Sequence, residues 1–92
     1  MPERYFDVRW PDGVEQRCYS PSSVVDQFFT PEHSYDLSEF VRRSEQALTL
    51  ASERVRDKHG YFCSAAADQL SQIKFRSEQF EKQDTVTVLR IY

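Results

Sequence analysis

The chain has 92 residues, of which 39% are hydrophobic and 14% aromatic, and 12 Lys and Arg against 15 Asp and Glu give it a formal net charge of -3. This length suits a single domain over residues 1–92, and the apolar content excludes a disordered tail. The acidic balance argues against nucleic-acid binding, which relies on clustered positive charge. The N-terminal stretch lacks the apolar core of a signal peptide and no apolar run could span a membrane, so we expect a cytoplasmic protein without membrane contact.

A β-hairpin is predicted at the start of the chain. Residues from Tyr5 to Trp10 alternate between two faces, residues from Val14 to Tyr19 form the partner strand, and Pro11-Asp12-Gly13 supplies the turn. Pairing Trp10 with Val14 keeps charges off the inner face, whereas a slip by one residue would place charge there. The outer-face pairs that this register predicts are Arg9 with Glu15, Asp7 with Arg17, and Tyr5 with Tyr19.

Three helices are predicted after the hairpin. A short helix has Ser20 as its N-cap and runs to about Phe28, and a loop at residues 30–34 follows. The main helix starts at the capping-box sequence Asp36-Leu37-Ser38-Glu39 and ends at Gly60. Cys63 or Ser64 caps the last helix, whose apolar positions recur as far as Phe80. The residues expected in the core are Leu48, Ala51, Val55, Leu70 and Ile73, with Tyr61 and Phe62 filling the bend between the two longer helices.

A final strand is predicted from Thr85 to Tyr92, which is rich in β-branched and aromatic residues. The order of elements is β-β-α-α-α-β. We therefore predict an α+β fold with a small antiparallel three-stranded sheet and helices packed on one face. Strict alternation places apolar side chains on both faces of the last strand, so we expect an exposed apolar row on the open face unless the short first helix covers it.

An exposed apolar patch on a small domain is typical of an interaction surface. We expect the open sheet face to bind a second copy of the chain or another protein. The residues predicted to form this partner surface are Tyr5, Arg9, Glu15, Arg17 and Tyr19.

Catalytic candidates are few. His59 and Cys63 are close in sequence, and a thiol beside an imidazole can act as a nucleophile or a metal ligand pair. Gly60 lies between them and ends the helix, so the two side chains need not share a face. The 2 glycines leave no glycine-rich phosphate loop, and we expect no metal and no cofactor. Cys18 and Cys63 are expected as reduced thiols.

Several motifs in order resemble one family of small bacterial proteins. They are Arg9-Trp10-Pro11-Asp12-Gly13, Arg17-Cys18-Tyr19-Ser20-Pro21-Ser22, Ala51-Ser52-Glu53-Arg54-Val55-Arg56, Cys63-Ser64-Ala65 with Asp68-Gln69-Leu70, and Val86-Thr87-Val88-Leu89-Arg90. The family is described as nitrogen-starvation response proteins encoded in gene clusters built around a nitrilase. The resemblance implies a cytoplasmic bacterial protein made under nitrogen limitation, beside nitrile or cyanide metabolism. It implies no reaction and carries no functional residue over.

The leading hypothesis is a non-catalytic accessory or protein-binding module. The alternative is a small enzyme or ligand carrier that acts on a nitrogenous small molecule through Cys63, with His59 as its partner. Binding of RNA or DNA along the basic main helix is a third reading, which the acidic balance disfavours. The reactivity of Cys63 near neutral pH separates the first two hypotheses, because a reactive thiol would favour chemistry.

Overall fold

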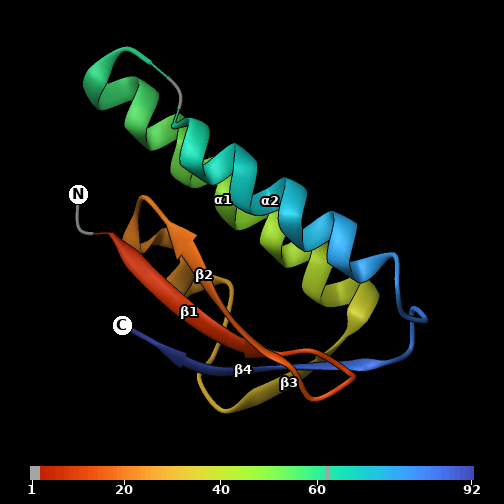
Figure 1. Cartoon of the computed structure of the whole chain (residues 1–92). Helices are drawn as coiled ribbons and strands as arrows, with labels where there is room; N and C mark the ends of the chain where they lie inside the picture. The colour runs from red at the N-terminus through yellow and green to blue at the C-terminus, as the bar shows by residue number, and fades with distance from the viewer. Residues whose placement is uncertain (1–2, 62) are drawn as a thin grey trace.

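The computed structural model describes residues 3–61 and 63–92. Its elements are β1 (Arg4–Arg9), β2 (Glu15–Ser20), the 3-10 helix η1 (Ser23–Gln27), β3 (His33–Asp36), α1 (Leu37–His59), α2 (Ser64–Ser77) and β4 (Thr85–Ile91). The strands form one antiparallel sheet in the order β2-β1-β4-β3, with α1 and α2 side by side over one face (Figure 1). The α+β class is confirmed, but the prediction of three strands is wrong because the sheet has four.

The predicted hairpin register is confirmed at every pair from Arg9 opposite Glu15 to Tyr5 opposite Tyr19. The turn closes as its residues require: the Gly13 N–H donates to the Trp10 carbonyl oxygen at 2.8 Å, with Gly13 at a φ of 87°. That left-handed conformation suits glycine because it has no Cβ. On the inner face, the Trp10 Nε1–H donates to Gln16 Oε1 at 2.9 Å, which satisfies the indole under the helices.

The strand that the sequence did not reveal is β3, which lies in and just after the predicted loop. It has four residues, of which only Tyr35 is buried, so neither length nor alternation marks it as a strand. Its pairing partner is β4, with Tyr35 opposite Val86. Ser34 and Thr87 hydrogen-bond through their hydroxyls at 2.8 Å. β3 therefore exists because β4 has a free edge beside it.

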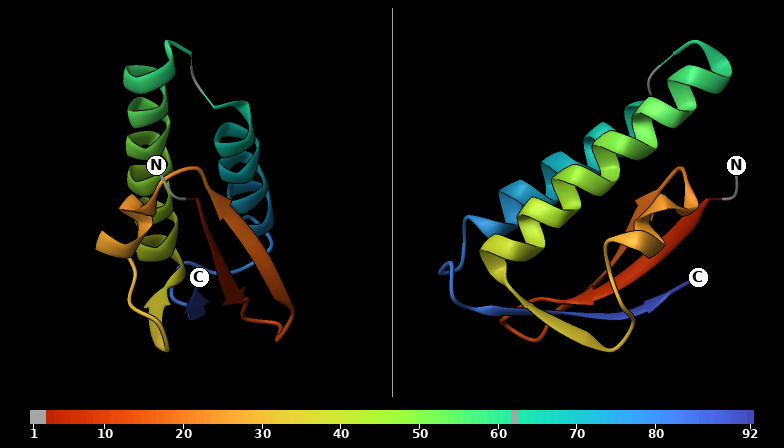
Figure 2. Two further views of the ribbon diagram at one scale, coloured as in Figure 1. Left: turned by 90° about the vertical axis from the view of Figure 1, so that its left-hand side faces the viewer. Right: turned by 180° about the vertical axis from the view of Figure 1, so that it is seen from behind.

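The first helix is shorter than predicted. Ser20 ends β2 and is not the N-cap, because that position belongs to Ser22, whose hydroxyl accepts the Val24 N–H at 3.3 Å. The helix is a single 3-10 segment that buries Val24 and Val25. It packs beside α1, on the helix side of the sheet, and leaves the opposite face uncovered (Figure 2).

The start of α1 is stabilised by the chain before β4 and not by the predicted capping box. Asp36 occupies the N-cap position without a side-chain capping bond. The Leu37 N–H instead donates to the Asp84 carbonyl oxygen at 2.7 Å. Glu39, the expected capping-box partner, binds Arg42 and Arg43 through its carboxylate. The predicted end is confirmed, since Gly60 adopts a left-handed φ of 81° and its N–H donates to the carbonyl of residue 56.

The core lies between the helices and the inner face of the sheet. Leu48, Ala51 and Ile73 are buried as predicted, whereas Val55 and Leu70 are half-buried. Tyr61 is 63% exposed, so the prediction that it fills the core is wrong, and Phe62 lies outside the described residues. The helices that the structure describes include none long and apolar enough to cross a membrane.

Candidate partner surface on the open face of the sheet

The last strand shows why the open face differs from the predicted apolar row. Asp7 pairs with Arg90 and Val8 pairs with Val88, which leaves Leu89 as an extra residue in a β-bulge. The bulge reverses the alternation from that point to the end of the strand. Ile91 therefore turns toward the core, where it is partly buried, and Arg90 turns outward. The bulge therefore changes which side chains of the last strand the open face carries: Val86, Val88 and Ile91 lie on the core side, and the Tyr92 ring lies on the open face.

Three tyrosines gather at one end of the open face and form what we call the tyrosine cluster: Tyr5, Tyr19 and Tyr92. The Tyr5 ring lies 5.7 Å from that of Tyr19 and 6.0 Å from that of Tyr92, between centroids. Tyr5 is 36% exposed and Tyr92 is 48% exposed. Tyr92 is the residue that the sequence reasoning missed. Arg90 was the available signal, because strict alternation would have put this charge on the face of Val86 and Val88.

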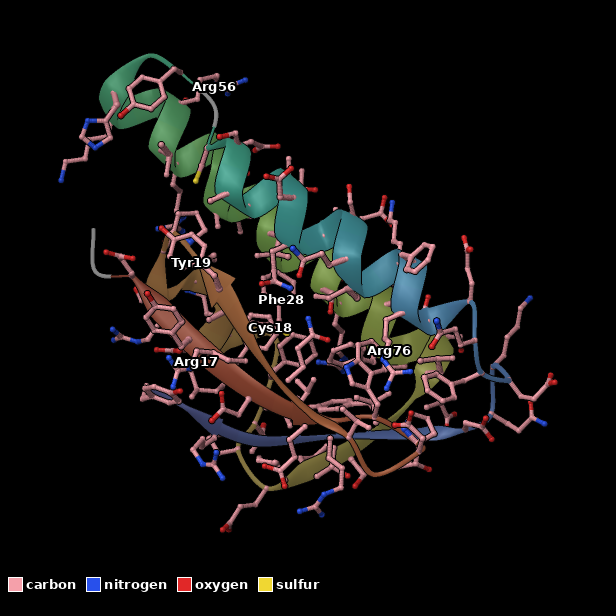
Figure 3. All side chains as sticks on the ribbon, in the orientation of Figure 1. Arg17, Cys18, Tyr19, Phe28, Arg56 and Arg76 are labelled. Atoms are coloured by element: carbon pink, nitrogen blue, oxygen red, sulfur yellow. The ribbon has the colours of Figure 1, made fainter. Side chains whose placement is uncertain are left out.

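Arg17 lies against the tyrosine cluster. Its guanidinium carbon is 5.6 Å from the centroid of the Tyr5 ring and 5.8 Å from that of Tyr92, in cation–π range of both. Figure 3 shows Arg17 on the side of the sheet away from the helices, with Cys18 on the opposite side. Among the described residues, no carboxylate forms an ion pair with Arg17. The guanidinium is therefore available to an anionic group of a partner.

Charged pairs continue the open face beyond the tyrosine cluster. Arg9 and Glu15 form the predicted ion pair at 3.3 Å, with both side chains 50% exposed. Asp7 lies opposite Arg17 in the register as predicted, but the ion pairs of the described residues do not include one between these two side chains. The Asp7 carboxylate instead accepts hydrogen bonds from Arg90 and from the Tyr92 hydroxyl, the latter at 3.2 Å. Asp7 and Arg17 are opposite in the register, but β4 supplies Asp7 with a second neighbour that binds it directly.

Burial and neighbouring charges shape the electrostatics at the β2 end of the sheet. Partial burial, together with Glu3 and Cys63, raises the pKa of the Tyr19 phenol to about 12. Burial and, to a lesser extent, Asp7 raise the pKa of the Cys18 thiol to about 12. Both groups are therefore neutral at physiological pH, and Cys18, which is fully enclosed, is not a nucleophile.

The His59 and Cys63 pair has no support from the geometry. His59 is exposed at the end of α1, where its ring lies 5.9 Å from that of Tyr61. Cys63 is a free, half-buried thiol at the N-cap position of α2, without a side-chain capping bond. No group of three or more His, Cys, Asp or Glu side chains that could hold a metal occurs within residues 3–61 and 63–92.

A groove of about 410 Å³ adjoins the tyrosine cluster where β1 begins and β4 ends. Its lining includes Phe29, Ile91 and Tyr92. Arg4 and Asp26 also line the groove and form an ion pair with each other at 3.4 Å. The groove is continuous with the tyrosine cluster, because Tyr92 belongs to both.

The fold and this surface define a small two-layer α+β protein whose sheet keeps one face open, with tyrosine and arginine side chains on it. The model of the family described as nitrogen starvation-induced protein NitG matches residues 5–91. The chain belongs to this family. Comparison with curated proteins and with solved structures finds no match.

Proposed function

We propose that the chain is a non-catalytic binding module that takes a partner protein on the open face of its sheet. The observation that carries this proposal is the tyrosine cluster around Arg17, which leaves two aromatic rings and a guanidinium accessible on one surface. Tyrosine and arginine are the side chains enriched where protein interfaces concentrate their binding energy. The surrounding pairs of Asp7 with Arg90 and of Arg9 with Glu15 supply a polar rim.

The kind of partner follows from the chemistry and from the family. A carboxylate presented beside an apolar or aromatic side chain would bind Arg17 while covering Tyr5 and Tyr92. The chain belongs to the nitrogen-starvation family, and the sequence resemblance implies gene clusters built around a nitrilase, so an enzyme of nitrile or cyanide metabolism is the first partner to test. The module would then act on that enzyme during nitrogen limitation without performing chemistry itself.

Affinity capture from nitrogen-starved bacterial cells tests the proposal with a matched pair of variants. Tyr92→Ser removes an exposed ring from the open face, and Phe75→Ser removes a ring that is 70% exposed on α2, outside that face. A protein retained by the wild type and by Phe75→Ser, but lost from Tyr92→Ser, is expected. Its direct binding is then measured by calorimetry with both purified proteins. Equal retention by all three chains would contradict the proposal.

A further inference from the structure

The strand β2 forms one border of the sheet (Figure 2). The Trp10 N–H donates to the Val14 carbonyl oxygen, so in the antiparallel ladder Gln16 and Cys18 direct their backbone groups toward β1. The residues that alternate with these two direct their backbone groups away from β1. The N–H and C=O groups of Glu15, Arg17 and Tyr19 therefore lie on the free edge of β2.

One of these edge groups already has a partner. The Gln69 side chain descends from α2, and its Oε1 accepts the Tyr19 N–H at 3.0 Å. Gln69 is only 8% exposed, so this contact is enclosed. The free part of the edge is thereby reduced to Glu15 and Arg17, both of which are exposed and have outward-facing side chains.

The spacing of these two residues makes the edge self-complementary. A second copy related by a two-fold axis would pair with β2 in antiparallel fashion. Centring the axis on Gln16 places Glu15 opposite Arg17 of the second copy, and each such pair exchanges both backbone hydrogen bonds. Centring it on Arg17 would oppose two guanidinium groups, and centring it on Glu15 would oppose two carboxylates. Centring it on Cys18 would require the Tyr19 N–H, which Gln69 occupies.

We propose that two copies of this chain assemble edge to edge through β2, with Glu15 of each copy opposite Arg17 of the other. Both sheets then become one continuous sheet with all of the helices on one side. Charged residues on an edge strand commonly prevent such pairing, and a row of one sign repels a second copy. Opposite charges two residues apart instead attract a second copy in the register centred on Gln16.

The opposite edge of the sheet is less suited to this role. β3 has four residues and follows Glu32, whose φ of 60° turns the chain sharply into the strand. Short edge strands present few backbone groups to a partner. The assembly through β2 leaves the three rings of the tyrosine cluster uncovered, because Tyr19 lies at the end of β2 away from the axis, although Glu15 of the second copy and an anionic group of a partner would compete for Arg17. This inference therefore goes beyond the proposed function and does not depend on it.

Charge reversal in sedimentation equilibrium tests the assembly. The wild type is expected to form a dimer at micromolar concentration. Glu15→Arg and Arg17→Glu each create two like-charged pairs, so each should raise the Kd by about tenfold. The double variant Glu15→Arg/Arg17→Glu restores unlike pairs and should return most of that affinity. Lys82→Glu, in the exposed loop before β4, changes the net charge as Arg17→Glu does and should leave the Kd unchanged.

The predicted register has its own test by disulfide formation in a Cys63→Ser background. Glu15→Cys and Arg17→Cys in a mixture should cross-link, because directly opposed residues have Cα atoms about 5.5 Å apart, within disulfide range. A dimer of either variant alone should not cross-link efficiently, because its two introduced cysteines, one from each copy, are separated by roughly 8 Å across the axis.

Circular dichroism establishes that each variant is folded before either test. A monomeric wild type at high micromolar concentration would overturn the proposal. So would a dimer that both single reversals leave intact, because it would have to form through another surface. Equal cross-linking of the mixture and of each single variant would overturn the register.

Discussion

Replacing Cys18 with alanine tests whether the inner face of the sheet is as closed to water as the structure shows. Cys18 is 0% exposed, and burial raises its pKa from 9.0 to about 12. Between these two values the unfolded chain loses the thiol proton while the folded chain keeps it. Stability therefore falls as pH rises through this window, by roughly 1.4 kcal/mol per pH unit at its steepest.

The magnitude follows from the two pKa values. From pH 9 to pH 11 the thiol should lower the free energy of unfolding of the wild type by about 2 kcal/mol, and Cys18→Ala should lack this loss. Between pH 9 and pH 11, Cys18→Ala should thus gain about 2 kcal/mol of unfolding free energy relative to the wild type. Tyr19 also has a raised pKa, but it is present in both proteins and cancels in the difference.

Urea denaturation of both proteins at pH 8, 9, 10 and 11 provides the measurement. A second experiment follows native thiol labelling with a chromogenic disulfide reagent, in which the half-buried Cys63 should react and Cys18 should react only after unfolding. A stability difference that stays constant with pH, together with rapid labelling of both thiols, would refute the burial of Cys18.

Leu48→Ala should lower the free energy of unfolding by about 2 to 5 kcal/mol, because Leu48 is 1% exposed and truncation leaves a cavity; an unchanged urea midpoint would contradict its place in the core. Asp7→Ala should cost about 1 to 3 kcal/mol, since the carboxylate is only 14% exposed and binds Arg90. Glu15→Ala removes a half-exposed ion pair and should lower the free energy of unfolding by less than about 1 kcal/mol. Equal losses for Asp7→Ala and Glu15→Ala in the same urea assay would contradict this ranking. Hydrogen bonds from two arginines lower the pKa of Glu39 below 4.5, so its stabilising contribution is present above that pH and is lost as pH falls through the folded-state value. The thermal midpoint should accordingly fall less from pH 7 to pH 3 for Glu39→Gln than for the wild type.

The hairpin and the long helix could be read from the sequence because the interactions that specify them are local. Alternation of side chains and the turn at Gly13 determine which residues of β1 and β2 face each other. The apolar spacing of α1 and its glycine stop at Gly60 likewise depend on neighbours within a few residues. For the partner surface, the same local rules were enough to put Tyr5, Arg17 and Tyr19 on one face.

The remaining features depend on contacts between distant parts of the chain. β3 forms only beside the free edge of β4, and the first turn of α1 uses the carbonyl oxygen of Asp84 in place of its own side chains. The bulge at Leu89 decides that Arg90 and Tyr92 join the open face, and so it changes the partner of Asp7. No local pattern specifies these choices, because a hydrogen-bond donor, a free strand edge or a charge selects its partner only among the groups that the tertiary structure brings within reach.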